Sequence, residues 1–213
     1  MADEEVLLVE GKDDDAVIKA IARHGASGLA FNVKHGELAR STGGIEWVLQ
    51  TLPTTLRQTD LKRLGVIVDA DVDLGSRWMS ITRILRAGGY SDTPADPEPE
   101  GTVIEPSAPL RPIVGIWLMP DNRLPGMLED FTAMLVPPGD PLFGYARGCV
   151  RGLPPEHVKF PQSHLPKAEI HTWLAWQEEP GKPLGLAITA RFLDASLAPA
   201  QAFRQWLVRL FGP

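Results

Sequence analysis

The sequence has little cysteine and no long apolar run. Cys149 is the only cysteine among 213 residues, so no disulfide can form within the chain. A chain without disulfides is typical of a reducing compartment, and no apolar stretch approaches the roughly 18–20 residues that a membrane-spanning helix needs. The first residues, MADEEVLLVEGKDDD, are acidic where a secretory signal peptide would be basic. We therefore expect a cytoplasmic protein that does not associate with a membrane.

An excess of positive charge is also missing. The chain has 27 acidic and 21 basic residues and a formal net charge of −6. Seven of the acids lie in residues 1–15, and the rest of the chain is balanced. A passive nucleic-acid binder draws its affinity from a broad basic surface, which this composition excludes. A nucleic-acid partner would have to be bound locally or through a bridging cation.

Short apolar runs alternate with amphipathic segments along most of the chain. This alternation predicts an α/β protein with a mostly parallel sheet and helices on both faces. The predicted strands are 6–9, 29–33, 64–68 and 113–120, and the predicted helices are 11–25, 44–58 with Pro53 as an interruption, 75–89, the part of 121–135 after a turn, 163–177 and the C-terminus. We expect a single domain, residues 1–213, in which the Pro-rich segment 91–112 forms an exposed loop or a hairpin. Residues 136–162, rich in Pro and Gly, show no clear pattern.

Carboxylates follow three of the predicted strands. Glu10 ends the first strand, Asp69 ends the third with Asp71 and Asp73 just beyond, and Glu129 comes soon after the fourth. Because the carboxyl ends of parallel strands meet at one edge of a sheet, we expect these side chains to lie near one another. Carboxylate oxygens are the ligands that Mg²⁺ or Mn²⁺ prefers. The pattern therefore indicates a divalent-cation site.

Asp14 is the acid of the first predicted helix that should face inward. At about 100° per residue it lies on the same helix face as Val17 and Ile21. Asp13 and Asp15 diverge to the sides, where the helix dipole is enough to explain them. An inward acid close to the strand ends needs a partner, so Asp14 is a candidate metal ligand.

The stretch VDADVDLG, residues 68–75, fits more than one motif. An EF-hand loop would need a glycine in place of Leu74 and an acid in place of Ser80, so that interpretation fails. A dehalogenase-type phosphatase also has D-x-D after an apolar strand, although Val72-Asp73 stands where a small residue and a threonine normally follow. The third interpretation is a Toprim-type metal site, with Glu-Gly after the first strand and D-x-D after a later one.

Three segments in this order, VLLVEGKDD, GVIVDADVD and PDNRLPGMLEDF, resemble a family of small stand-alone Toprim-like proteins known mainly as a domain of unknown function. HTWLAWQEEPGKPLGLAI and FRQWLVRLF near the end are similar too, so the resemblance covers nearly the whole chain. It implies a Toprim-like, Rossmann-like fold related to the Toprim domains of OLD-type nucleases. No fused ATPase domain, zinc-binding cysteines or tyrosine in an obvious nucleophile context is present, so topoisomerase and primase activity are not expected.

The resemblance also implies roles for matching residues. The implied ligands of Mg²⁺ (or Mn²⁺) are Glu10, Asp14, Asp69, Asp71, Asp73 and Glu129. Glu10 would act as general acid/base as well, Asp73 would bind through water, and Glu129 would serve a second metal. Lys167, in LPKAEI, is similar to a late lysine that steadies transition-state charge.

Basic residues near the acidic motifs are candidates for steering a phosphate. These are Lys12, Arg77 and Arg123. Lys167 and His171, four residues apart on a predicted helix, face away from its apolar side. A solvated polar face is the simpler interpretation of that pair.

The combined features predict a Mg²⁺-dependent nuclease or a related phosphotransfer enzyme acting on nucleic acid. Divalent cations neutralise the phosphate, activate water and stabilise the leaving oxygen, and so supply the positive charge that the chain lacks. One alternative is a non-catalytic Toprim-like module that binds a partner protein or nucleic acid. The other is the dehalogenase-type phosphatase, with Asp69 as the nucleophile.

Overall fold

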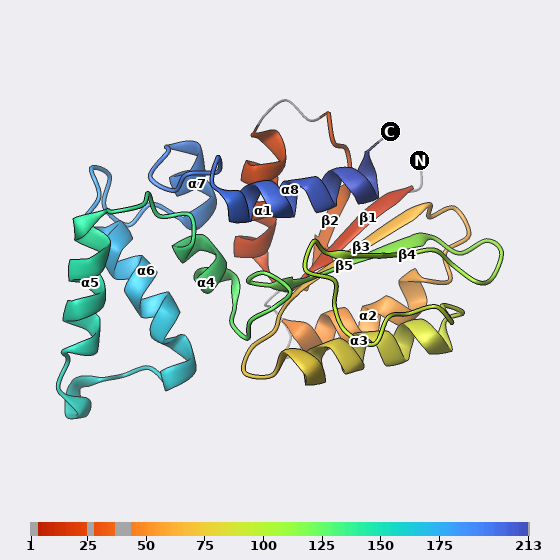
Figure 1. Ribbon diagram of the computed structural model, residues 1–213, viewed down its shortest axis with the longest axis horizontal. Helices are drawn as coiled ribbons and strands as arrows, with labels where there is room; N and C mark the ends of the chain where they lie inside the picture. Colours follow the sequence, from red (N-terminus) through yellow and green to blue (C-terminus); the bar gives the residue numbers. More distant parts are fainter. Residues whose placement is uncertain (1–3, 25–27, 37–43, 213) are drawn as a thin grey trace.

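A computed structural model describes residues 4–24, 28–36 and 44–212 of the chain. Its centre is a five-stranded sheet with the strand order β2-β1-β3-β5-β4 (Figure 1). The strands are β1 (Glu5–Val9), β2 (Asn32–His35), β3 (Arg63–Asp69), β4 (Thr102–Ile104) and β5 (Ile113–Met119). All pair in parallel except β4, which pairs antiparallel with β5 at one edge. The predicted α/β, Rossmann-like class is confirmed.

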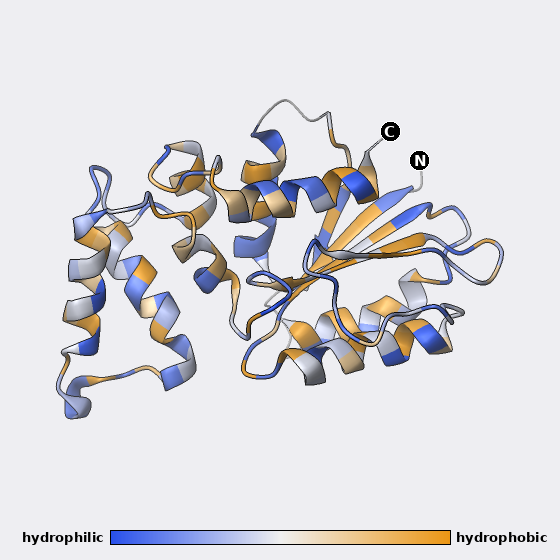
Figure 2. Cartoon of the chain, viewed as in Figure 1, coloured by the Kyte–Doolittle hydropathy of each residue, from blue (hydrophilic) through white to orange (hydrophobic). Residues whose placement is uncertain are grey.

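Helices cover both faces of this sheet. On one face lie α2 (Ile45–Thr55) and α3 (Leu74–Ala87), and on the other lie α1 (Lys12–Arg23) and α8 (Ala198–Phe211) (Figure 1). A strand covered on both sides can be apolar along its whole length, as β3 is from Leu64 to Val68. The helices instead turn one apolar stripe toward the sheet and a polar stripe outward, as Figure 2 shows.

The remaining helices form a helical extension, which we define as residues 128–189. It contains α4 (Leu128–Ala133), α5 (Pro141–Arg151), α6 (Leu165–Ala175) and α7 (Leu184–Thr189), with 3-10 turns at Pro155–His157 and Gln162–His164. Figure 1 shows the extension to the side of the sheet, with α5 and α6 lying side by side. No helix in the described ranges is both long enough and apolar enough to cross a membrane.

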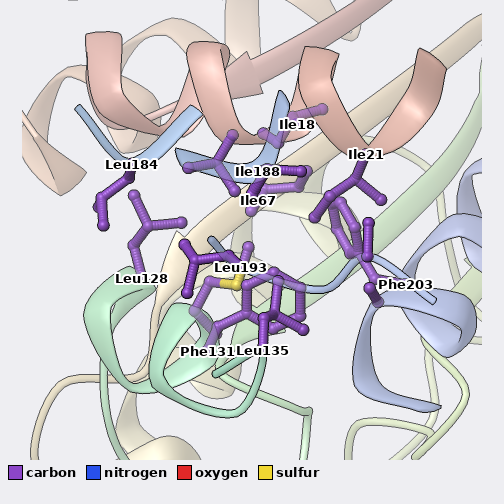
Figure 3. Close-up of a cluster of buried hydrophobic side chains, with 14 of the residues drawn as sticks. Ile18, Ile21, Ile67, Leu128, Phe131, Leu135, Leu184, Ile188, Leu193 and Phe203 are labelled. Atoms are coloured by element: carbon purple, nitrogen blue, oxygen red, sulfur yellow. The ribbon is translucent and has the colours of Figure 1, made fainter. Parts of the chain in front are cut away.

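One apolar cluster joins the extension to the sheet. Figure 3 shows side chains of α1, α4, α7 and α8 meeting around Ile67 of β3. Ile18, Phe131, Ile188 and Phe203 are among its buried members. Burial of each large apolar side chain contributes about 1.5–3 kcal/mol. The cluster therefore fixes α4, which bears Glu129, against the strands that bear Glu10 and Asp69.

Two predictions about secondary structure are wrong, and two stretches that the sequence left open are now assigned. Pro53 does not interrupt α2, which continues to Thr55, so the helix tolerates the loss of the one hydrogen bond that residue 53 would donate to the Leu49 carbonyl. The second strand begins at Asn32 rather than three residues earlier. The unassigned stretch 136–162 contains α5, whose start is marked by Asp140 accepting a hydrogen bond from the Phe143 amide at 2.9 Å. Segment 91–112 contains β4, which gives it the hairpin form with β5.

Candidate functional site

Glu10 and Asp69 meet at the carboxyl ends of β1 and β3. These strands are direct neighbours in the sheet, so their ends lie side by side. The Oε1 atom of Glu10 accepts a hydrogen bond from the Asp69 amide at 2.9 Å. The amide of Ile45, at the start of α2, is also close enough to lower the pKa of Glu10. Glu10 therefore lies where two strands and one helix meet.

Gly44, directly before α2, approaches Glu10 closely. Gly44 has a φ of 66°, and a Cβ at this position would lie 3.3 Å from Glu10 Oε2. Both the left-handed backbone and the tight contact favour glycine. Burial raises the pKa of Glu10, although the amides of Asp69 and Ile45 oppose this.

Asp69 connects the sheet to α4. Its Oδ1 accepts a hydrogen bond from the amide of Leu128, the first residue of α4, at 2.9 Å. The pKa of Asp69 is raised well above its usual value, first by burial and then by repulsion from Glu10, Asp14 and Glu129. Asp69 is therefore an acid surrounded by other acids.

Asp14 lies inside the protein, as the helical spacing predicts. It is 7% exposed and shares the buried face of α1 with Val17 and Ile21. Its Oδ2 accepts a hydrogen bond from the amide of Gly11 at 3.0 Å. Burial, followed by repulsion from Glu10, raises the pKa of Asp14 to about 7. Near neutral pH this side chain therefore exists in both protonation states.

Glu129 and Lys167 form an ion pair between α4 and α6. Lys167 Nζ lies 2.7 Å from Glu129 Oε1, and the glutamate is 4% exposed. Burial lowers the pKa of Lys167, but the contact with Glu129 outweighs this, so the pKa is raised overall. Lys167 and His171 are both exposed, as a solvated polar face predicts, but the ammonium of Lys167 is also paired with a buried acid. We call Glu10, Asp14, Asp69 and Glu129 the carboxylate cluster.

Asp71 lies beside the cluster, on a loop with a constrained backbone. Its φ is 53°, and its amide donates to the carbonyl of Gly126 at 2.8 Å. Gly126 has a φ of 144°, and a Cβ there would come within 2.7 Å of Asp130 Oδ2, so only glycine fits. The Asp71 carboxylate pairs with Arg77. Sequence reasoning missed Gly126, for which the neighbouring Pro125 is the only local signal.

The other predicted site residues lie outside the carboxylate cluster. Asp73 is exposed and caps α3, accepting hydrogen bonds from Ser76 N at 3.0 Å and Ser76 Oγ at 2.6 Å, which lower its pKa. Arg123 is exposed and lies 4.0 Å from a carboxylate oxygen of Glu100. Lys12 is exposed at the first position of α1.

The donor set of the cluster fits a hard divalent cation in its chemistry. Four carboxylates come together, and the burial and mutual repulsion that raise the pKa values of Asp14 and Asp69 are what a cation would relieve. Within the described parts of the chain, however, no three His, Cys, Asp or Glu side chains are arranged so that they could hold a metal ion as they stand. Cation binding would therefore require side chains of the cluster to turn toward one ion.

Comparison with known proteins gives a family but no characterised relative. No curated protein and no solved structure matches the chain significantly. One family matches over residues 4–212, which is nearly the entire sequence, and its description reads "Protein of unknown function (DUF3226)". The chain belongs to this family.

Proposed function

We propose that this protein is a divalent-metal-dependent nuclease with a Toprim-type site, using Mg²⁺ or Mn²⁺ to hydrolyse phosphodiester bonds. The observation that carries the proposal is the carboxylate cluster itself. Its four acids come from the residue after β1, from α1, from β3 and from α4, and their electrostatic coupling appears in the raised pKa values of Asp14 and Asp69. Clusters of coupled, shifted carboxyl groups at the end of a parallel sheet are typical of functional sites.

The cluster residues would hold the cation, with Asp71 at their edge. A bound divalent cation would neutralise phosphate charge and lower the pKa of water at the site. Glu10, whose pKa is raised by burial, is suited to take a proton from the attacking water. Lys167 is paired with Glu129, and the charge of Asp69 also raises its pKa; its ammonium would be the donor to a phosphate oxygen.

Cleavage assays with an isosteric variant test this proposal. Single- and double-stranded DNA and RNA would be incubated with the protein in Mg²⁺, in Mn²⁺ and in EDTA. We expect cleavage of at least one substrate with metal only, and a loss of about a hundredfold or more in Asp69→Asn. Asp60→Asn, an exposed site in a turn, is the matched control. Absence of cleavage in all conditions, or equal rates for the Asp69→Asn and wild-type proteins, would contradict the proposal.

One observation favours a second candidate function, a non-catalytic binding module. Glu10 and Asp69 each accept a backbone hydrogen bond from another element, which gives both acids a structural role that needs no metal. Glu10→Gln keeps an acceptor for the Asp69 amide while removing the charge. A Glu10→Gln protein that retains full cellular function and a stoichiometric partner in pull-down would favour the module over the nuclease.

A further inference from the structure

Two neighbouring hollows lie in the helical extension, next to the carboxylate cluster. The first, of about 440 Å³, is lined by Asp71, Gly126 and the N-terminal turn of α6. The second, of about 270 Å³, lies between α4, α5 and α6. Both are lined by Asp130, Leu165 and Pro166. They therefore adjoin along these residues, and together we call them the groove, which extends from the Asp71 loop past the start of α6 to α5.

Two arginines line the far end of this groove. Arg147 and Arg151 are four residues apart on α5, so they share one helix face. The Nε of Arg147 lies 3.1 Å from Glu169 Oε2, and the Nε of Arg151 donates to Oε1 of the same side chain. Glu169 is buried on α6, whereas the arginine side chains are 45% and 53% exposed.

The charges at this end of the groove balance, unlike those of the protein as a whole. Arg147 and Arg151 match the two acids of this hollow, Glu169 and Asp130, in a protein of net charge −6. The two ion pairs use the Nε atoms, and each guanidinium carries further N–H donors at its terminal nitrogens. The Phe143 ring, 5.7 Å from Arg147 Cζ, helps to fix one of the two planes. Half-exposed, oriented guanidinium groups match the geometry of phosphate oxygens.

We propose that Arg147 and Arg151 bind the phosphate backbone of a single-stranded nucleic acid that lies along this groove. This inference rests on the proposed nuclease function, because it assigns the strand whose scissile phosphate would lie at the carboxylate cluster. The acids at the near end repel a phosphate unless a cation is bound, so the arginine pair supplies the anchor away from the reacting bond. Because a duplex is stiff over a short length, a flexible single strand is the form that can bend into two small adjoining hollows.

Binding without a divalent cation tests the inference separately from cleavage. Anisotropy of a fluorescein-labelled single-stranded oligonucleotide would be measured in EDTA across a range of salt concentrations. We expect Arg151→Gln to weaken binding about tenfold and to reduce the slope of log affinity against log salt by about one. The double variant Arg147→Gln/Arg151→Gln should lose more. Arg83→Gln, an exposed arginine of α3, is the charge-matched control and should bind like the wild type.

A purely structural role of the arginines predicts a different result. In that case Arg151→Gln would lower the melting temperature but bind the oligonucleotide normally, and the inference would be overturned. Arg151→Gln retains the Arg147–Glu169 ion pair, and Arg151→Lys keeps the charge if the glutamine variant does not fold. The lysine variant should then show weaker binding with an unchanged salt slope, and unaltered affinity in it would overturn the inference.

Further outcomes separate this inference from the nuclease itself. No binding by the wild type in EDTA, equal losses in the Arg151→Gln and Arg83→Gln proteins, or a preference for duplex would each overturn it. Arginine-dependent binding without cleavage in any metal would support the groove and contradict the nuclease. Cleavage together with binding that does not depend on the arginines would support the nuclease and contradict the groove.

Discussion

On the sheet side of the carboxyl edge, Glu10, Asp14 and Asp69 are held by backbone amides, and burial raises the pKa of each. On the side of the helical extension, Glu129 is paired with Lys167, and Glu169 is paired with two arginines. Within the described ranges no ion pair reaches the three acids of the sheet side, and Arg77, which pairs with Asp71, only lowers the pKa of Glu10 by its charge. The extension compensates its buried acids with cations, and Glu169 receives two.

This contrast has an energetic meaning. An amide hydrogen bond recovers only part of what a buried carboxylate loses on leaving water, whereas an ion pair recovers more but becomes costly when one partner is removed. The buried acids of the sheet side should therefore lower the free energy of unfolding. The acids of the extension should lower it only when their basic partners are removed. The sheet side suits a bound cation and the extension suits a bound polyanion, and four predictions test this difference.

The largest effect is expected from Asp14→Asn. The pKa of Asp14 is about 7 in the folded protein and 3.8 ordinarily. Between these values the folded state holds a proton that the unfolded state has lost, so the wild type loses stability as pH rises from about 4 to 7. In EDTA at pH 8, Asp14→Asn should raise the free energy of unfolding by about 2–3 kcal/mol, and by less at pH 5. Urea denaturation across this pH range measures it.

Asp13→Asn is the control for this prediction, because Asp13 is exposed on the same turn of α1. It should leave the pH dependence of unfolding unchanged. A gain in stability that is the same at pH 5 and pH 8 in Asp14→Asn would contradict the assignment of the effect to this carboxyl group.

On the extension side, Lys167→Met should destabilise the protein. Glu129 would remain buried without its cation, at a cost of about 2 kcal/mol, and the double variant Lys167→Met/Glu129→Gln should recover most of the loss. Lys62→Met, which breaks the exposed pair with Glu4, should change unfolding by less than about 0.5 kcal/mol. If the double variant is no more stable than Lys167→Met alone, the lysine acts through something other than Glu129.

Adding metal should sharpen the contrast from the sheet side. Saturating Mn²⁺ is expected to raise the melting temperature of the wild type by about 5 °C relative to EDTA, because it binds the folded state alone. Asp69→Asn should lose this shift, while Arg151→Gln, on the extension, should keep it. Equal Mn²⁺ shifts in the wild-type and Asp69→Asn proteins would remove Asp69 from the cation site.

Features that depend on local periodicity could be predicted from the sequence. Apolar runs predicted β1, β3 and β5. Their parallel order predicted that Glu10 and Asp69 lie close together, and the helical spacing predicted that Asp14 is buried. The Lys167–Glu129 contact could not be read in this way, because it depends on how α4 and α6 pack after a long intervening segment. Helix α5 was missed because Gly144 and Gly148 weaken its helical pattern, although the Asp-Pro start was present.

The smallest expected effect concerns Asp73, which the sequence motif links to the cation site and the structure uses as the cap of α3. Removal of the cap in Asp73→Ala should lower the melting temperature by about 2–3 °C, whereas Asp73→Ser keeps a capping oxygen and should remain close to the wild type. The two variants therefore separate the cap from the charge. The wild-type Asp73 carboxylate is exposed and already accepts hydrogen bonds from Ser76. If Asp73 only caps the helix, Asp73→Ser will therefore bind Mn²⁺ with wild-type affinity in calorimetric titration. A clear fall in Mn²⁺ affinity in Asp73→Ser, with the melting temperature unchanged, would instead extend the cation site from the buried cluster to the exposed start of α3.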